Sequence, residues 1–181
     1  DVCDGLDNDC NGINDDSWPL WSVVEYVFHG TDKTAGKDSE FNITWYDGEK
    51  RPPEHIANLP EGDRLPDGGS VFVGPEGQMV LEHVGMPKLY PANQFRDYEL
   101  PQVQHGDHYV DWIDACRRGD TTVSGDLIYG ALLTETVHLG NIAVRYPDQP
   151  LEWDSHNLRF TNLSAADRWL TKEYREGFKL T

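Results

Sequence analysis

The chain begins with residues whose types and spacing could hold a metal ion, in the stretch DVCDGLDNDCNGINDD. Carboxylate and amide side chains recur there in the pattern D-x-D-x-N-G-x-x-D, and the glycine permits a sharp turn. Calcium is bound in proteins by hard oxygen ligands from a flexible loop, including main-chain carbonyl groups. The ligands that this spacing predicts are Asp7, Asp9, Asn11, the Ile13 carbonyl and Asp15, the last directly or through water.

This acidic segment is not a complete EF-hand, because the loop position that should carry a bidentate Glu is Trp18. It is closer to the shorter aspartate loops of dockerins and thrombospondin-type repeats. The string VCDGLDNDCNG also resembles the Asp-rich metal-binding motif of secreted bacterial proteins of the MopE type. We therefore predict a calcium loop. The alternative is a solvated acidic tail, because clustered like charges repel one another and commonly stay unfolded.

Two of the three cysteines lie in the same acidic segment. Cys3 and Cys10 are candidates for a disulfide in an oxidising compartment, and the bridge would lower the entropic cost of forming the loop. Zinc or copper bound by the two thiolates is a weaker alternative, because two cysteines without nearby histidines do not complete a site. The third, Cys116 in DWIDACRRGD, is predicted to be a buried helix residue.

Side chains suited to other chemistry are scattered. The seven histidines form no H-E-x-x-H pair, and no serine lies in a G-x-S-x-G turn or beside a credible base. Trp45, Tyr46 and Asp47 end a predicted strand and can stack on and hydrogen-bond a sugar, although packing at the strand end is the alternative. His138 falls on the apolar face of a predicted long helix, where it is either a core histidine or a residue facing a substrate cleft.

The elements that must position these residues begin with strands. Alternation of apolar and polar residues predicts a hairpin over 21–28 and 41–48, and a second over 70–83 around a GPEG turn. Residues 49–69 read as a long loop rich in Pro and Gly, and residues 85–104 show no period. Short strands are predicted at 151–154 and 158–162.

Helices are predicted after the first strands. The stretch 107–120 is amphipathic, with Tyr109, Trp112, Ile113 and Cys116 on one face. Residues 124–146 are more apolar, so we expect a central buried helix that begins at a Ser124 cap and ends before Pro147. A closing helix is predicted over 163–178, with Ser164 as its cap.

Strands followed by helices, without regular βαβ alternation, indicate an α+β fold. We expect an open-faced, largely antiparallel sheet backed by helices on one face, preceded by the short acidic metal-loop segment. The strands carry large residues on both faces, so the uncovered face should be apolar and the chain should self-associate as a dimer or higher oligomer.

The charge of the chain limits its partners. A formal net charge of −17 and a pI near 4.5 repel phosphate groups, which argues against nucleic acid and anionic membranes as partners. No apolar run approaches the roughly 20 residues that a membrane-spanning helix needs. Cations and neutral, sugar-like small molecules are the ligands that such a surface favours.

From about Ser17 onward the sequence resembles the C-terminal domain of the Gfo/Idh/MocA oxidoreductases. The segments that carry the resemblance, in the family's order, are ITWYDGEKRPP, LPDGGSVFVGPEGQMVL, DWIDACRRGD, LLTETVHLGNIAVR, LEWD and TNLSAADRWLTKEYREGF. The resemblance divides the chain into an acidic segment, 1–16, and a substrate-binding and oligomerisation domain, 17–181. It implies an enzyme that oxidises or reduces sugars or cyclitols with NAD or NADP, which an N-terminal Rossmann domain binds.

That cofactor domain has no counterpart in the sequence, which contains no G-x-G-x-x-G between a strand and a helix. The family's Glu-Lys-Pro segment and its helix with an Asp and His pair are also missing. NAD or NADP would therefore be bound only through an N-terminal domain missing from this chain, which alone should be inactive. The alternative is a secreted, calcium-stabilised carbohydrate-binding or interaction module without enzymatic activity. In either case a bacterial, periplasmic or secreted protein is expected.

We predict that the acidic segment binds calcium in preference to magnesium, because many flexible oxygens suit the larger ion better than a strict octahedron. Isothermal titration calorimetry with each ion, repeated on the Asp9→Ala variant, measures this. Calcium binding that is unchanged in the variant, or absent in the parent, would contradict the prediction.

Overall fold

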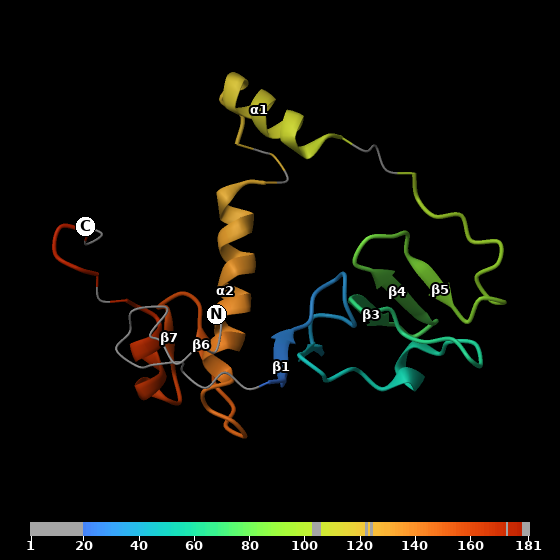
Figure 1. The fold of residues 1–181 in the computed structure, drawn as a ribbon, viewed down its shortest axis with the longest axis horizontal. Helices are drawn as coiled ribbons and strands as arrows, with labels where there is room; N and C mark the ends of the chain where they lie inside the picture. The colour runs from blue at the N-terminus through green and yellow to red at the C-terminus, as the bar shows by residue number, and fades with distance from the viewer. Residues whose placement is uncertain (1–19, 103–105, 122, 124, 173, 179–181) are drawn as a thin grey trace. The chain divides into compact units, whose positions relative to one another are not determined.

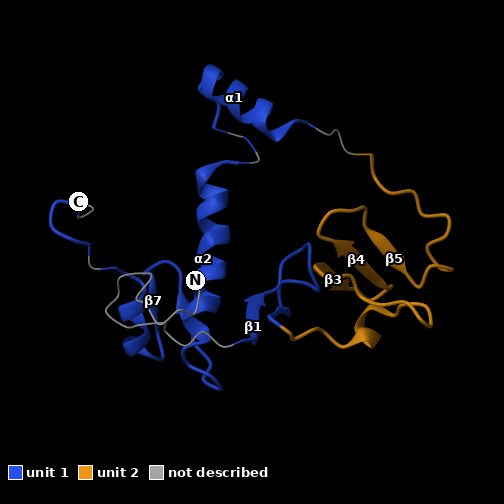
Figure 2. Cartoon of the chain, in the orientation of Figure 1, with its two compact units in different colours: residues 1–48, 106–181 blue, residues 49–105 orange. Residues whose placement is uncertain are grey.

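The structure is a computed structural model, and it describes residues 20–102, 106–121, 123, 125–172 and 174–178. The chain divides into two compact units, shown in different colours in Figure 2. Unit 1 comprises Asp1–Gly48 and Gly106–Thr181, and unit 2 comprises Glu49–His105. Helices and small antiparallel sheets occur together, which confirms the α+β class.

The first described element of unit 1 is the predicted first hairpin. β1 (Ser22–His29) and β2 (Glu40–Asp47) are antiparallel partners along their whole length. One face of the hairpin is apolar, because alternate residues of a strand point to the same side. The large side chains on this apolar face are Val24, Tyr26, Phe28, Phe41, Ile43 and Trp45. The opposite face is mixed and consists of Val23, Glu25, Val27, His29, Glu40, Asn42, Thr44 and Tyr46.

α2 (Leu127–Ala143) packs against this hairpin through a glycine. A Cβ atom built on Gly140 would overlap the hydroxyl of Tyr26 and lie 3.8 Å from Cγ1 of Val24. The missing side chain therefore lets the helix approach β1 closely. Burial raises the pKa of the Tyr26 phenol, and a hydrogen bond with the Gly140 backbone partly offsets this effect.

The start and the burial of α2 differ from the prediction. Its N-cap is Asp126, whose Oδ1 accepts hydrogen bonds from the N–H groups of Ile128 at 2.6 Å and Tyr129 at 3.1 Å; Ser124 lies outside the described residues. The helix was expected to be buried, but Leu127 is 89% exposed and only Gly140 and Ile142 are buried. A largely apolar helix sequence predicts burial but does not identify the surface that provides it.

α1 (His108–Arg118) confirms the predicted amphipathic helix. Oδ1 of Asp107 accepts from the N–H groups of Tyr109 and Val110, and Gly119 ends the helix with a φ of 67°, a left-handed conformation that glycine adopts without strain. The prediction of a buried Cys116 is wrong, because this thiol is free and exposed and the buried residue is its neighbour Ala115. The spacing identified the apolar face of α1, but Trp112 on that face is 59% exposed.

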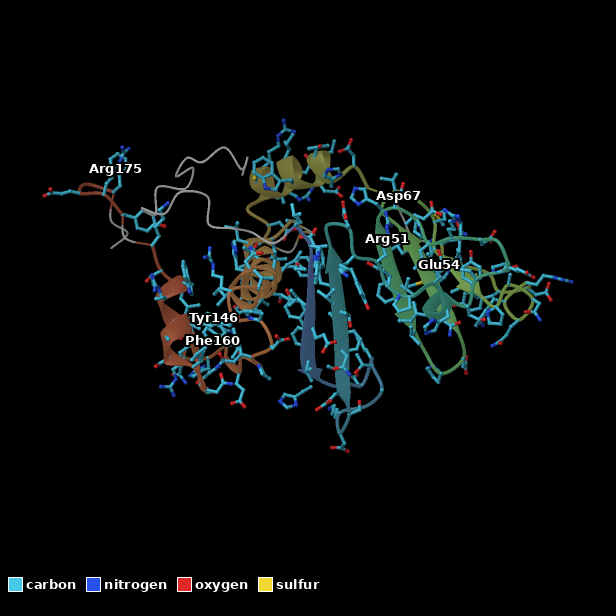
Figure 3. The ribbon with its side chains drawn as sticks, turned by 60° about the horizontal axis from the view of Figure 1, so that its bottom comes forward. Arg51, Glu54, Asp67, Tyr146, Phe160 and Arg175 are labelled. Carbon is cyan, nitrogen blue, oxygen red and sulfur yellow. The ribbon has the colours of Figure 1, made fainter. Side chains whose placement is uncertain are left out.

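The C-terminal part of unit 1 holds a small core. The two predicted short strands are present as β6 (Trp153–Asp154) and β7 (Arg159–Phe160), and they pair antiparallel. Figure 3 labels Phe160 and Tyr146 of this core. The buried residues are Ile142, Phe160 and Ala166. The partly buried side chains packed around them are Leu139, Tyr146, Leu151, Trp153, Leu163, Trp169 and Leu170.

The predicted closing helix over 163–178 is wrong. Only η2 (Ser164–Trp169) is helical in the described residues of this stretch, as a 3₁₀ helix. Ser164 is its first residue and not its cap; the N-cap position is Leu163, with no side-chain hydrogen bond. The carboxylate of Asp167 accepts the N–H of Phe160 at 2.8 Å. This tertiary hydrogen bond ties the segment to β7, so packing outweighs the helical propensity of the sequence.

Unit 2 contains the second predicted hairpin and a strand that the sequence did not reveal. β3 (Gly69–Val73) and β4 (Gln78–Glu82) pair as expected, and β5 (Lys88–Tyr90) extends the sheet in the order β3-β4-β5 (Figure 1). β5 is too short to show a period, and prolines flank it on both sides. η1 (Glu54–Ala57) packs against β3 and β4. Arg51 donates to the carbonyl of Pro66 at 2.9 Å and to Asp67 at 3.1 Å, which closes the long loop (Figure 3).

The described strands pair as three small sheets and not as one: β1-β2, β3-β4-β5 and β6-β7. The single open-faced sheet backed by helices is therefore a proposal for the assembled protein. Within the described ranges, no helix has both the length and the apolar character to cross a bilayer.

We predict that Gly140→Ala destabilises unit 1 by about 1–3 kcal/mol, because the added methyl group would displace Tyr26 from α2. Gly130→Ala is the matched control on the same helix, since a Cβ there meets no atom within 4 Å. It should stabilise by up to about 1 kcal/mol through helix propensity. Urea unfolding followed by circular dichroism measures both changes.

Removing the Tyr26 hydroxyl provides the internal check. The double variant Gly140→Ala with Tyr26→Phe should recover part of the lost free energy of unfolding, because the overlapping oxygen is gone. Equal effects of Gly140→Ala and Gly130→Ala would show that the contact with β1 does not limit the approach of α2.

Candidate functional site

The predicted metal and disulfide residues cannot be placed, because they all lie outside the described residues. They are Asp7, Asp9, Asn11, Ile13 and Asp15 for calcium, and Cys3 and Cys10 for the disulfide. In the part of the chain that the structure describes, no group of three or more His, Cys, Asp or Glu side chains is arranged to hold a metal ion. Calcium binding by the acidic segment stays a prediction.

The predicted sugar-stacking residues do not form one platform. Trp45 and Tyr46 lie on opposite faces of the hairpin, because neighbouring residues of a strand point in opposite directions. Trp45 is 55% exposed on the apolar face, opposite Val24, whereas Tyr46 is half-buried. Asp47 accepts the N–H of Gly48 at 2.7 Å, so its carboxylate stabilises the turn that follows β2. Of these three predicted residues, Trp45 alone offers an exposed ring.

His138 is exposed on α2, so the first of its two interpretations, a core histidine, is wrong, and the second, a residue facing a substrate cleft, stays a prediction. Its Nδ1 lies 3.5 Å from Nδ2 of Asn141, one helical turn later. One turn earlier, Oε1 of Glu135 accepts the indole N–H of Trp153 at 2.7 Å. Side chains three positions apart on a helix are neighbours, so Glu135, His138 and Asn141 form a line that we call the α2 polar stripe.

The β6–β7 hairpin holds one end of this stripe in place. The rings of Trp153 and Phe160 pack with centroids 5.1 Å apart. Asp154 closes the turn by accepting from the side chain of Asn157 at 2.7 Å and from the N–H groups of His156 and Asn157. These hydrogen bonds, that of the Asn157 side chain first, lower the pKa of the Asp154 carboxyl. The Phe160 ring and the turn closed by Asp154 therefore hold Trp153 in the position from which its indole N–H donates to Glu135.

The α2 polar stripe combines the groups that a ligand rich in hydroxyls requires. A carboxylate accepts hydrogen bonds, an amide donates and accepts, and an imidazole does either according to its tautomer. The sequence indicated His138 but missed Glu135 and Asn141. Their signal was present in LLTETVHLGNIAVR, as residues with hydrogen-bonding side chains three positions to each side of the histidine.

No protein-family model matches the chain, and no curated protein or solved structure matches it either. The resemblance to the Gfo/Idh/MocA family therefore enters the functional argument as a proposal.

We predict that Trp153 and Glu135 are energetically coupled by about 1 kcal/mol through their hydrogen bond. A double-mutant cycle of Trp153→Phe and Glu135→Ala separates this coupling from the packing that the smaller ring loses. Glu135→Gln should cost less than Glu135→Ala, because the amide oxygen still accepts the indole N–H. Urea unfolding gives the four free energies, and strictly additive losses would contradict a stabilising hydrogen bond.

Proposed function

We propose that the chain is the C-terminal, substrate-binding and oligomerisation domain of an NAD(P)-dependent oxidoreductase of the Gfo/Idh/MocA type. The substrate would be a sugar or a cyclitol-like molecule. The observation that carries the proposal is α2, where the family-like segment LLTETVHLGNIAVR forms one helix and aligns Glu135, His138 and Asn141 along it. The other family-like segments supply most of β2, the β3–β4 hairpin, most of α1, β6 and η2, in the family's order.

The exposed apolar surface of unit 1 supports a role beside another protein surface. Leu127, Ile128 and Tyr129 begin α2 and are largely exposed, and Trp112 is exposed on α1. Soluble monomers rarely expose large contiguous apolar patches. A cofactor domain or a second copy would bury such residues. In that assembly, we propose that the small sheets belong to one open-faced layer with helices on one side and with β2 at its edge.

The nicotinamide cofactor does not fit the described residues. Its pyrophosphate requires a glycine-rich turn from a strand into a helix, where backbone N–H groups are free to donate. The glycine-rich stretch here, PDGGSVFVGPEG, instead forms β3 and the turn into β4. NAD or NADP would be held by a separate domain of the whole protein. The contribution proposed for this chain is to bind and orient the sugar, with the stripe hydrogen-bonding its hydroxyl groups.

The second hypothesis from the sequence is a secreted calcium-stabilised module. The two hypotheses predict different coding sequences upstream of Asp1. An upstream Rossmann segment with an Asp and His helix would support the oxidoreductase. A signal peptide directly before the acidic segment, or further Asp-rich loops, would support the module. Sequencing the coding region on the 5′ side of Asp1 therefore discriminates between the two before any assay.

We predict that His138→Ala raises the KM for the sugar substrate about tenfold in the whole protein, which corresponds to the loss of one hydrogen bond of about 1.4 kcal/mol. Thr134→Ala is the matched control, because its hydroxyl donates to the Gly130 carbonyl within α2 at 2.7 Å. Oxidation or reduction of a panel of sugars and cyclitols, followed by NAD(P)H absorbance, measures both variants.

Fluorescence titration with NADH locates the cofactor site in the same experiment. The whole protein should show saturable quenching, and the 181-residue chain alone should not. Saturable quenching of the isolated chain at micromolar NADH would contradict the proposed division of labour. A whole protein that neither binds NAD(P) nor turns over any of these substrates would overturn the proposed function.

A further inference from the structure

The outer edge of β2 offers main-chain hydrogen-bonding groups to another strand. β1 occupies one side of β2, and among the described residues no strand pairs with the other side. Every residue of β2 except the half-buried Tyr46 is exposed. β1 differs, because Val24 is buried and Tyr26 contacts Gly140 of α2. β2 is therefore the more open strand of the hairpin.

The phase of the hairpin shows which groups point outward. The N–H of Gly30 donates to the carbonyl of Ser39 at 2.7 Å, so these opposed residues form a hydrogen-bonded pair. Such pairs alternate with non-hydrogen-bonded pairs along an antiparallel ladder. Ile43 is in phase with Ser39 and bonds to β1. The residues of β2 whose N–H and C=O groups point away from β1 are Glu40, Asn42, Thr44 and Tyr46.

This edge lacks the features that normally prevent strand pairing. Natural edge strands are protected by proline, lysine, a bulge or very short length. β2 has eight residues, no proline or lysine, and an uninterrupted register with β1. Its carboxylates, Glu40 and Asp47, lie only at the two ends. The centre of the edge is neutral, although the chain as a whole has a net charge of −17.

We propose that β2 pairs antiparallel with β2 of a second copy, about a two-fold axis at Ile43. Asn42 then faces Thr44 of the second copy, and both residues present outward main-chain groups. On the apolar face, Phe41 faces Trp45 of the second copy and Ile43 faces its own counterpart. Glu40 faces Tyr46, so no charge lies opposite a like charge. Aromatic pairs and matched polar pairs across strands are stabilising.

The phase allows two neighbouring registers, and both are less complementary. An axis at Thr44 would place the carboxylate of Asp47 against Phe41. An axis at Asn42 would carry Trp45 beyond the end of the partner strand at Glu40. The axis at Ile43 keeps both aromatic pairs and stays within the strand bounds. The edge contact rests on the self-association that is part of the proposed function, and it specifies where the two copies meet. It requires neither the cofactor nor the sugar.

A disulfide at the axis tests this register. Non-hydrogen-bonded pairs place their Cα atoms about 4.5 Å apart, which a disulfide spans. In a background of Cys3→Ser, Cys10→Ser and Cys116→Ser, Ile43→Cys should oxidise to a covalent dimer at least about tenfold faster than Val27→Cys. Val27 is the matched control, because it lies on β1 and is 63% exposed against 38% for Ile43. Random collision would therefore favour the control. Non-reducing electrophoresis over time gives both rates.

Proline substitutions test the hydrogen bonds of the edge without changing a thiol. Thr44→Pro removes an outward N–H from β2 and leaves the ladder with β1 intact, so the dimer should dissociate. Glu25→Pro removes an outward N–H from β1 and should leave the dimer unchanged. Sedimentation equilibrium at tens of micromolar protein measures both variants. The parent dimer should strengthen with moderate salt, which screens the negative charge.

The proposal is overturned if Ile43→Cys crosslinks no faster than Val27→Cys, or if the parent is a monomer at both low and moderate salt. It is also overturned if Glu25→Pro dissociates the dimer and Thr44→Pro, folded by circular dichroism, does not. If Thr44→Pro does not fold, the comparison of crosslinking rates decides. Turnover of sugar by the reduced Ile43→Cys form of the whole protein is measured in parallel. Turnover without crosslinking overturns the edge contact alone, and the absence of turnover in the parent overturns the proposed function.

Discussion

The close approach of α2 to β1 at Gly140 is the contact on which the arrangement of unit 1 depends. Only a residue without a side chain lets Tyr26 lie against the helix there. Two residues later, Ile142 enters the core with Phe160 and Ala166. The last turns of α2 thus connect the β1–β2 hairpin to the β6–β7 hairpin and η2. An isolated two-stranded hairpin is marginally stable in water, so both hairpins require this helix.

The position of the α2 polar stripe follows from the same contact. Gly140 and Ile142 are buried and hold the C-terminal turns of α2 in place. Asn141 lies between these two positions. Glu135 is held by Trp153, which packs on Phe160 of the core. His138 lies between these two anchored residues and is itself exposed. A ligand-binding role is therefore proposed for the one part of α2 that is both held from the core and open on its surface.

Local patterns predicted the elements well where the determinants were local. Both long hairpins and both α-helices follow from alternation, turn residues and the 3.6-residue period. Asp126 caps α2 where Ser124 was expected, because both types cap helices and spacing alone does not choose between residues two positions apart. The predictions failed where tertiary contacts determine the structure. η2 replaces a full helix where Asp167 bonds to Phe160, and Cys116 is exposed because periodicity does not identify what covers a face.

The candidate site was predicted only in part for a related reason. His138 was recognised by its residue type, but its partners are defined by the helical spacing and by Trp153 from a hairpin that follows α2. Trp45 and Tyr46 were grouped because they are adjacent in sequence, although a strand separates adjacent side chains onto opposite faces.

For self-association, the distribution of charge over the chain matters more than the net charge. A net charge of −17 disfavours indiscriminate association, yet β2 keeps its carboxylates at its ends. A neutral, unprotected strand edge on a chain of this net charge is therefore a position where a second copy can approach without bringing like charges into contact.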